Sequence, residues 1–224
     1  MVQTRKNMKN LIIIGASGYG REVYNSAIES YGYQEEFVVK GFLDDDLNAL
    51  DGFKNYPPIL DTIKDYQPQA DDVFVCALGN VVTRKKISES ILSKGGEFYS
   101  LIHKTAYISM NVKMGKGCMI LAGARLHCDV TLGDYVIVQP FAIIGHDCTI
   151  GSWSLINTYS DLGGASRLGE GVTLQINSFV MPLAVVGDYA TIGAGSVTIR
   201  RVKAGQTVFG VPAKPVLVPK PKEV

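Results

Sequence analysis

The sequence is poor in charge, in long apolar runs and in histidine, and each shortage argues against a class of protein. Charged residues make up 19% of the 224 residues. This is below the roughly 25% of an average soluble domain and argues against a disordered chain and against a bundle of solvated helices. No segment approaches the roughly 20 continuous apolar residues of a transmembrane helix, so we expect no membrane span. The net charge of +1 lacks the basic excess typical of nucleic-acid binding, so we expect no nucleic-acid partner.

Cysteine and histidine are scarce, and their spacing argues against disulfides and metal sites. The four cysteines form no C-x-x-C pair and no secretory signal precedes them, so we expect a protein of the reducing cytoplasm whose cysteines are small core residues. The three histidines are 24 and 19 residues apart, which matches no zinc-ligand spacing, so we expect no metal. These residues are Cys76, Cys118, Cys128, Cys148, His103, His127 and His146.

Glycine is abundant, at 24 residues, and one group of glycines lies among alternating strand and helix patterns near the start of the chain. We expect strands at 11–14, 37–43 and 73–78, and helices at 21–31 and 82–93. Arg84 is expected on the exposed side of the second helix. The alternation predicts an α/β, Rossmann-like domain over residues 1–101, with a small parallel sheet and helices on its faces.

The turn of residues 15–20, with the sequence GASGYG, joins the first strand to the first helix. Unpaired N–H groups and the positive end of a helix dipole make such a turn a candidate phosphate site. Its spacing is G-x-x-G-x-G rather than the G-x-G-x-x-G of dinucleotide-binding domains, which disfavours NAD and leaves open a tight turn that binds nothing. Asp44 and Asp45 end the second strand at the same sheet edge, where they would bind a ribose or base, or form a solvated acidic loop.

A strict period of six residues begins at Ile102. Sixteen aliphatic residues, from Ile102 to Ile192, stand at six-residue intervals, and a small residue or valine stands four places after each. This period is typical of a parallel β-helix with three hexads in each coil. Glycines at 115, 133, 151, 169 and 187 are each 18 residues apart, and we expect them to form one corner of each coil. The β-helix is predicted over 102–197, followed by a C-terminal strand or loop and a tail over 198–224.

His146 is the histidine best placed for chemistry. It occupies the third position of its hexad, which is not one of the two inward-facing sets, so its side chain should point outward. A surface histidine is usually inert, but the adjacent Asp147 can hold one ring nitrogen and make the other a stronger base.

Four segments together resemble the NeuD/PglD-type sugar acyltransferases over nearly the whole chain: the hexads, the ending GVPAK at 210–214, the opening GASGYG, and GFLDD at 41–45. The resemblance implies a left-handed β-helix and a homotrimer with active sites between subunits. It also implies transfer of an acetyl group from acetyl-CoA to the amine of a nucleotide-linked amino sugar in bacterial surface glycan biosynthesis. In this family His146 would be the general base, supported by Asp147, and the Gly164 N–H would bind the acyl carbonyl.

The resemblance implies two sets of binding residues. Those for acetyl-CoA are Gly164, Leu155, Ile176, Ala194 and Lys214. Those for the acceptor and its nucleotide are Ser17, Gly18, Tyr19, Asp44, Asp45, Gly79 and Gln139. Three of these residues differ from those frequent at the same places in the family: Tyr19 stands in place of a His, Gln139 in place of an Asn and Leu155 in place of a His. These differences leave the pose of the acceptor open.

Three other functions remain as alternatives. The same base would serve an O-acetyltransferase that acts on sialic acid or another sugar. A non-catalytic trimer that binds a sugar nucleotide would show binding without turnover. A nicotinamide-dependent oxidoreductase is supported only by the N-terminal glycines.

Overall fold

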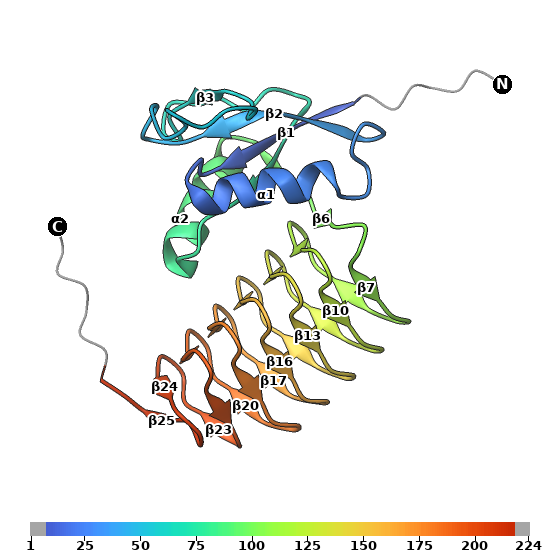
Figure 1. Ribbon diagram of the computed structural model, residues 1–224, viewed down its shortest axis with the longest axis vertical. Coiled ribbons are helices and arrows are strands. Elements are labelled where there is room, and N and C mark those ends of the chain that lie inside the picture. Colours follow the sequence, from blue (N-terminus) through green and yellow to red (C-terminus); the bar gives the residue numbers. More distant parts are fainter. Residues whose placement is uncertain (1–7, 218–224) are drawn as a thin grey trace. The chain divides into compact units, whose positions relative to one another are not determined.

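The computed structural model of the chain describes residues 8–217 and forms two compact units, Met1–Lys104 and Thr105–Val224 (Figure 1). Residues 1–7 and the end of the predicted tail, 218–224, lie outside the described residues. The first unit contains both helices that the described residues form, and the second unit is built of short strands.

The first unit is a five-stranded parallel sheet in the order β3-β2-β1-β4-β5 with two helices. Its elements are β1 (Lys9–Ile14), α1 (Gly18–Ile28), β2 (Phe37–Leu43), β3 (Ile59–Asp61), β4 (Asp72–Cys76), α2 (Val81–Ser93) and β5 (Glu97–Phe98), followed by β6 (Leu101–Ile102). The predicted Rossmann-like α/β class is confirmed, whereas the short edge strands β3 and β5 were not predicted.

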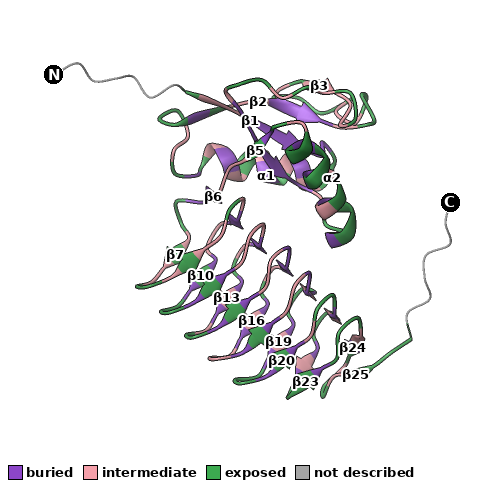
Figure 2. Cartoon of the chain, turned by 180° about the vertical axis from the view of Figure 1, so that it is seen from behind, coloured by how far each residue is buried: buried purple, intermediate pink, exposed green. Residues whose placement is uncertain are grey.

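The central strand of this sheet is covered on both faces. Leu11, Ile12, Ile13 and Ile14 are each 0% exposed, and the middle of the sheet appears as buried in Figure 2. A strand buried on both faces needs a continuous apolar run rather than an alternating one, which is why this segment was recognisable from the sequence.

Helix α1 begins three residues earlier than the sequence predicted, at Gly18 instead of Arg21, and ends at Ile28. The helix can start here because Gly20 has no side chain. A Cβ at Gly20 would overlap the carbonyl of Gly15, so glycine permits the first turn of the helix to pack against the end of β1. Part of the predicted glycine turn is therefore the first turn of α1.

The second unit is a parallel β-helix whose coils repeat every 18 residues. Three flat faces run along it, with strand orders β22-β19-β16-β13-β10-β7, β23-β20-β17-β14-β11-β8 and β25-β24-β21-β18-β15-β12-β9. The predicted fold class, a Rossmann-like domain followed by a hexapeptide β-helix, is confirmed. The strands are β7 (Tyr107–Ile108), β8 (Lys113–Met114), β9 (Met119–Ile120), β10 (Arg125–Leu126), β11 (Thr131–Leu132), β12 (Ile137–Val138), β13 (Ile143–Ile144), β14 (Thr149–Ile150), β15 (Leu155–Ile156), β16 (Asp161–Leu162), β17 (Arg167–Leu168), β18 (Thr173–Leu174), β19 (Phe179–Val180), β20 (Val185–Val186), β21 (Thr191–Ile192), β22 (Val197–Thr198), β23 (Arg201–Val202), β24 (Thr207–Phe209) and β25 (Lys214–Pro215).

The interior of the β-helix is a stack of aliphatic residues bordered by small ones. Most of the predicted sixth-residue positions are buried, for example Ile144 and Leu162 at 0% exposed. The small residues that follow include serines, which satisfy their hydroxyls inside the coil: Ser160 donates to the carbonyl of Gln175 at 2.8 Å. Buried hydroxyls paired in this way avoid the cost of an unsatisfied polar group.

The spaced glycines directly follow one strand of each coil, where a corner begins, as predicted. They do not adopt the left-handed backbone conformation, which occurs instead at the third residue after each aliphatic from Ile108 on, often a non-glycine such as Asp147 with φ 58°. The spaced glycines are needed for close approach between coils. A Cβ at Gly133 would lie 2.6 Å from the backbone N of Ser152, and one at Gly151 would lie 2.6 Å from that of Glu170.

The cysteine prediction is correct for three of four residues. Cys76, Cys118 and Cys148 are buried, but Cys128 is exposed at a corner of the β-helix.

Among residues 8–217, no helix is long and apolar enough to cross a membrane.

Candidate functional site

One candidate site lies at the carboxyl edge of the N-terminal sheet, between β1 and β4, where the connections leave in opposite directions along the sheet. In open parallel sheets, ligands bind at such a switch point. The glycine turn is held to the neighbouring strand there: the Gly15 N–H donates to the Leu43 carbonyl at 2.8 Å, and the Ala16 N–H donates to Asp44 Oδ2 at 2.7 Å. Asp44 thus fixes the shape of the turn.

Two helix N-termini are directed at this edge. Ser17 is the N-cap of α1, and its side chain makes no capping hydrogen bond; the next residue, Gly18, is exposed. At α2, Asn80 caps the helix by accepting from the Thr83 N–H at 2.9 Å, and Gly79 beside it has open space around it. The first turn of α1 therefore offers N–H donors to an anion.

Two other residues predicted to bind the nucleotide interact with other residues of the N-terminal unit. Asp45 accepts a hydrogen bond from the Ile63 N–H at 3.1 Å, so it ties the loop after β2 to the segment after β3. Tyr19 is half-buried and interacts electrostatically with Arg84. Arg84 is only 2% exposed, so its predicted exposure was wrong. Burial lowers the pKa of the Arg84 guanidinium, and Tyr19 acts in the opposite direction.

A second candidate site lies in the β-helix at the turns that follow β10, β13, β16 and β19, here named the His146 corner. His146 Nδ1 and Asp147 Oδ2 are 2.6 Å apart, and their side chains are 63% and 59% exposed. Asp147 has the left-handed conformation, which aspartate tolerates better than most residues. The outward direction predicted for His146 and its pairing with Asp147 are both present.

Gly164 lies one coil beyond His146 and directly against its ring. A Cβ on Gly164 would overlap His146 Nε2 and lie 2.7 Å from Cε1, so only glycine leaves room for the ring in this position. The Leu183 N–H donates to the Gly164 carbonyl at 3.0 Å, whereas the Gly164 N–H has no acceptor among residues 8–217.

The Gly164 N–H, which has no acceptor in the described part of the chain, differs from the backbone N–H groups at the same place in the turns of another corner. These turns follow β11, β14, β17 and β20 and are here named the Gly151 corner. There a side chain one coil on accepts the hydrogen bond: Asp188 Oδ1 accepts from the Glu170 N–H at 2.9 Å. The residue one coil beyond Gly164 is Pro182, which has no polar side chain. The sequence therefore leaves this donor available at the His146 corner.

The remaining predicted residues of the β-helix lie elsewhere. The turns that follow β12, β15, β18 and β21, here named the Gln139 corner, contain Gln139, Ile176 and Ala194. The side chain of Gln139 is 8% exposed, and that of Ile176 is 51% exposed. Leu155, on β15, is 4% exposed, and Lys214 is exposed on β25, paired with Phe209. A single chain therefore does not bring these residues to His146.

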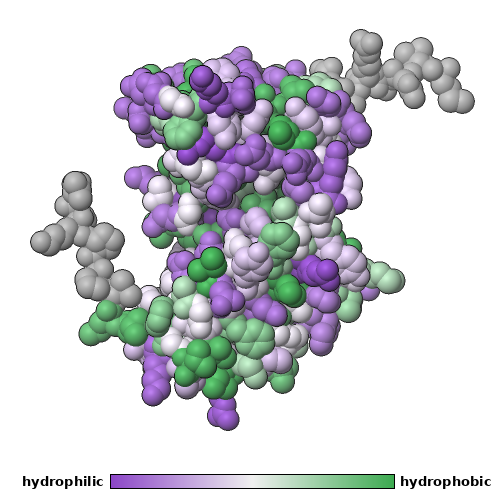
Figure 3. All heavy atoms as spheres, in the orientation of Figure 1, coloured by the Kyte–Doolittle hydropathy of each residue, from purple (hydrophilic) through white to green (hydrophobic). Residues whose placement is uncertain are grey.

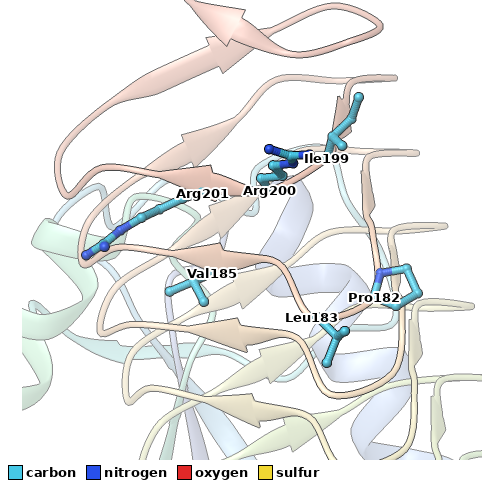
Figure 4. A pocket seen from close by; sticks show the side chains of 6 residues that line it. All are labelled: Pro182, Leu183, Val185, Ile199, Arg200 and Arg201. Atoms are coloured by element: carbon cyan, nitrogen blue, oxygen red, sulfur yellow. The ribbon is translucent and has the colours of Figure 1, made fainter.

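A hollow of about 510 Å³ opens further along the His146 corner (Figure 4). Its apolar wall includes Leu183 and Ile199, which are 76% and 52% exposed, and two guanidinium groups border it. Figure 3 shows apolar side chains exposed over these C-terminal coils. The hollow is lined by Pro182, Leu183, Val185, Ile199, Arg200 and Arg201, contributed by two successive coils.

Known proteins match both units of the chain. Residues 10–91 match the PglD N-terminal domain family, and residues 111–145 and 123–160 match the bacterial transferase hexapeptide family (six repeats). A GDP-perosamine N-acetyltransferase of Escherichia coli O157:H7 is 28% identical over 216 residues, which cover 90% of this chain and 94% of that protein. The chain belongs to the NeuD/PglD-type sugar acyltransferases.

Solved structures share the architecture of this sugar acyltransferase. The acetyltransferase domain of PglB from Neisseria gonorrhoeae FA1090, in complex with acetyl coenzyme A, superposes with a TM-score of 0.83 at 29% identity, over 93% of this chain and all (100%) of that one. Perosamine N-acetyltransferase from Caulobacter crescentus has a TM-score of 0.82 at 24% identity, over 93% and 97%, which shows the shared fold.

Arg200 and Arg201, which border the hollow, are not among the residues predicted from the sequence, because they fall in the segment 198–224 that was predicted as a C-terminal strand or loop and tail. The sequence does contain a pattern that points to Arg200: Pro182 and Arg200 continue the 18-residue spacing that links His146 to Gly164.

Among residues 8–217, no group of three or more His, Cys, Asp or Glu side chains is arranged to hold a metal ion.

Proposed function

We propose that the protein transfers the acetyl group of acetyl-CoA to the amine of a nucleotide-linked amino sugar, with His146 as the general base. The observation that carries the proposal is the His146–Asp147 pair, joined at 2.6 Å with the other ring nitrogen against Gly164. The named N-acetyltransferase among its relatives supports an amine acceptor. The family resemblance supports a cytoplasmic enzyme of bacterial surface glycan biosynthesis.

In the proposed reaction, Asp147 holds the His146 Nδ1–H and thereby leaves Nε2 as the proton acceptor. The acceptor amine attacks the thioester carbonyl carbon, its proton passes to Nε2, and the carbon–sulfur bond breaks to release the coenzyme as a thiol. General-base assistance of this kind contributes roughly 10²- to 10⁴-fold to the rate. The exposure of both side chains leaves the base accessible to two large substrates.

Gly164 supplies the electrostatic part of the mechanism. Its N–H has no acceptor among residues 8–217 and stands beside the ring of His146. A backbone donor in this place stabilises negative charge on the carbonyl oxygen as the amine attacks, a contribution that is typically about 10²- to 10³-fold for one donor.

The hollow at the His146 corner suits the arm of acetyl-CoA. An apolar wall that includes Leu183 matches the largely apolar pantetheine arm, and Arg200 and Arg201 are suited to bidentate contact with the coenzyme phosphates. Leu155, Ile176, Ala194 and Lys214, which the family resemblance assigns to the coenzyme, lie away from the His146 corner. In the proposed homotrimer they come from the neighbouring subunit.

The nucleotide of the acceptor is placed at the carboxyl edge of the N-terminal sheet. The N–H groups of the α1 first turn, from Gly18 on, would bind phosphate, and the exposed backbone of Gly79 leaves room for the ligand. Asp45 would accept from the ribose or base with the carboxylate oxygen that does not bind the Ile63 N–H.

The test is thiol release from acetyl-CoA with a panel of UDP-, GDP- and dTDP-linked amino sugars. We expect turnover with one or more of them and a fall of roughly 10²- to 10⁴-fold for His146→Ala. Cys128→Ala is the matched control, because Cys128 occupies the same corner position one coil earlier and should keep full activity. Binding of the nucleotide sugar without thiol release would overturn the proposal in favour of a non-catalytic binding protein.

A further inference from the structure

A half-buried cation of the N-terminal unit, Arg21, lies beside the exposed start of α1. The Arg21 N–H donates the first hydrogen bond of this helix, to the Ser17 carbonyl at 3.0 Å. Side chains of a helix lean toward its N-terminus. The Arg21 guanidinium accordingly lies next to Gly18: its Nη2 is 4.0 Å from the position that a Cβ at Gly18 would take.

The aromatic ring of Phe53 holds this guanidinium. Arg21 Cζ lies 3.5 Å from the centroid of the Phe53 ring, which is a cation–π contact. A stacked guanidinium uses its flat face and leaves the N–H groups at its edge for other partners. Within residues 8–217 the Arg21 side chain forms no hydrogen bond and no ion pair, so these donors are available to a ligand.

The loop that carries Phe53 is attached to the glycine turn and to α1 on either side of this residue. Before Phe53, Asp44 accepts a hydrogen bond from the Ala16 N–H at 2.7 Å. After Phe53, Tyr56 packs edge-to-face against Tyr24 of α1, with ring centroids 5.5 Å apart. The position of Phe53 over the guanidinium is therefore supported by contacts at both ends of the loop.

The same loop is acidic, which makes a cation at this place necessary for an anionic ligand. Residues 44–52 contain four aspartates and no lysine or arginine. Within residues 8–217, none of these carboxylates forms an ion pair with Arg21. The positive charge of Arg21 is thus kept beside the start of α1 instead of being neutralised by the loop.

We infer that Arg21 binds one of the two phosphates of a nucleoside diphosphate group, while the N–H groups of the first turn of α1 bind the other. The inference rests on the proposed function and adds a residue to its acceptor site. The N–H groups that precede Arg21 in α1 have no acceptor within the helix, and one phosphate is enough to occupy them. The guanidinium fork beside them binds two oxygens of the neighbouring phosphate. Phe53 is a positioning residue, because it acts through Arg21.

This arrangement distinguishes acceptors by their number of phosphates. A sugar linked to a nucleoside diphosphate contacts both the helix N-terminus and Arg21. A sugar linked to a monophosphate contacts only the helix N-terminus, and a free sugar such as sialic acid contacts neither. Arg21 therefore favours diphosphate-linked sugars among the acceptors that the alternatives leave open.

The experiment measures by titration calorimetry how UDP, GDP and dTDP, and the matching UMP, GMP and dTMP, bind to the wild type and to Arg21→Gln. For the diphosphate that binds the wild type most tightly, we expect the Kd to rise about ten- to a hundredfold in Arg21→Gln, and that of its monophosphate by less than about threefold. Arg21→Lys, which keeps the charge but not the fork, should recover part of the loss. Phe53→Leu, which removes the ring, should raise the diphosphate Kd about two- to fivefold.

The matched control is Lys54→Gln, which removes an exposed positive charge next to Phe53 and should leave the diphosphate Kd within about twofold of wild type. Without ligand, the melting temperature of Arg21→Gln should lie within about 3 °C of wild type. A loss no larger than that of Lys54→Gln overturns the inference, because it would be a general effect of charge. An equal loss for diphosphate and monophosphate also overturns it.

Thiol release from acetyl-CoA is measured on the same proteins and separates this inference from the proposed function. Thiol release with a nucleotide-linked amino sugar, together with an unchanged diphosphate Kd in Arg21→Gln, overturns the inference alone. Diphosphate binding that depends on Arg21, without thiol release, overturns the proposed function and leaves the role of Arg21 standing. Failure of the wild type to bind any of the three diphosphates overturns the inference.

Discussion

At the scale of single residues, the proposed chemistry depends on the absence of a side chain at Gly164. We predict that Gly164→Ala lowers kcat/KM by about a hundredfold, because the added Cβ would overlap His146 Nε2 and turn the ring out of position. The His146 ring is exposed and can rotate away, so the fold should tolerate the change, with the melting temperature within about 3 °C of wild type. Steady-state kinetics and thermal unfolding of the same preparation measure both effects.

The outcome also tests the assignment of His146. Retention of more than about a tenth of the wild-type kcat/KM would mean that the position of the ring over Gly164 is unimportant. A large loss of stability would mean that Gly164 serves the packing of the coils instead, as Gly151 does.

The place of His146 in its hexad predicted the outward direction of its side chain, and the adjacent Asp147 predicted the pairing that the structure has. The sequence did not reveal that Asp44 binds the Ala16 N–H, since this contact joins the ends of two strands. It also placed Arg84 in solvent, because a local helix pattern does not show which neighbours cover a long side chain.

At the scale of elements, glycine serves close approach between coils and is not required for the left-handed corners. We predict that Gly151→Ala lowers the free energy of unfolding by at least about 2 kcal/mol, because the Cβ would overlap the backbone of Gly169 and lie 2.6 Å from the N of Glu170. Ala165→Gly replaces alanine by glycine at a left-handed corner with φ 57°. This variant should change the free energy of unfolding by less than about 1 kcal/mol. Urea unfolding of both variants gives the comparison.

A larger effect for Ala165→Gly than for Gly151→Ala would mean that the left-handed residue of a corner, and not the close approach at the spaced glycine, matters more for stability. The sequence predicted the β-helix because its period excludes other folds, and it predicted β2 with the bounds that the structure has. It failed at the start of α1, where contact between Gly20 and Gly15 extends the helix backward into the glycine turn. That contact depends on tertiary packing, which a local pattern does not record.

At the scale of the whole molecule, the proposed site is incomplete within one chain. His146 and Gly164 lie at one corner of the coil, and Gln139 and Ile176 lie at another, with a flat face between them. Exposed apolar side chains such as Phe141 are suited to bury against a second copy. In the homotrimer that the family resemblance implies, each site would take its base from one subunit and Gln139 from the next.

This arrangement predicts that two inactive variants restore each other. His146→Ala and Gln139→Ala should each lose at least about 90% of activity alone. If the two are unfolded together, mixed in equal amounts and refolded, a quarter of the sites would join an intact His146 to an intact Gln139, so about a quarter of wild-type activity should return. The same mixture without unfolding is the control and should stay inactive. No recovery after refolding into trimers would place both residues in one subunit's site, and full activity of Gln139→Ala alone would remove that residue from the site.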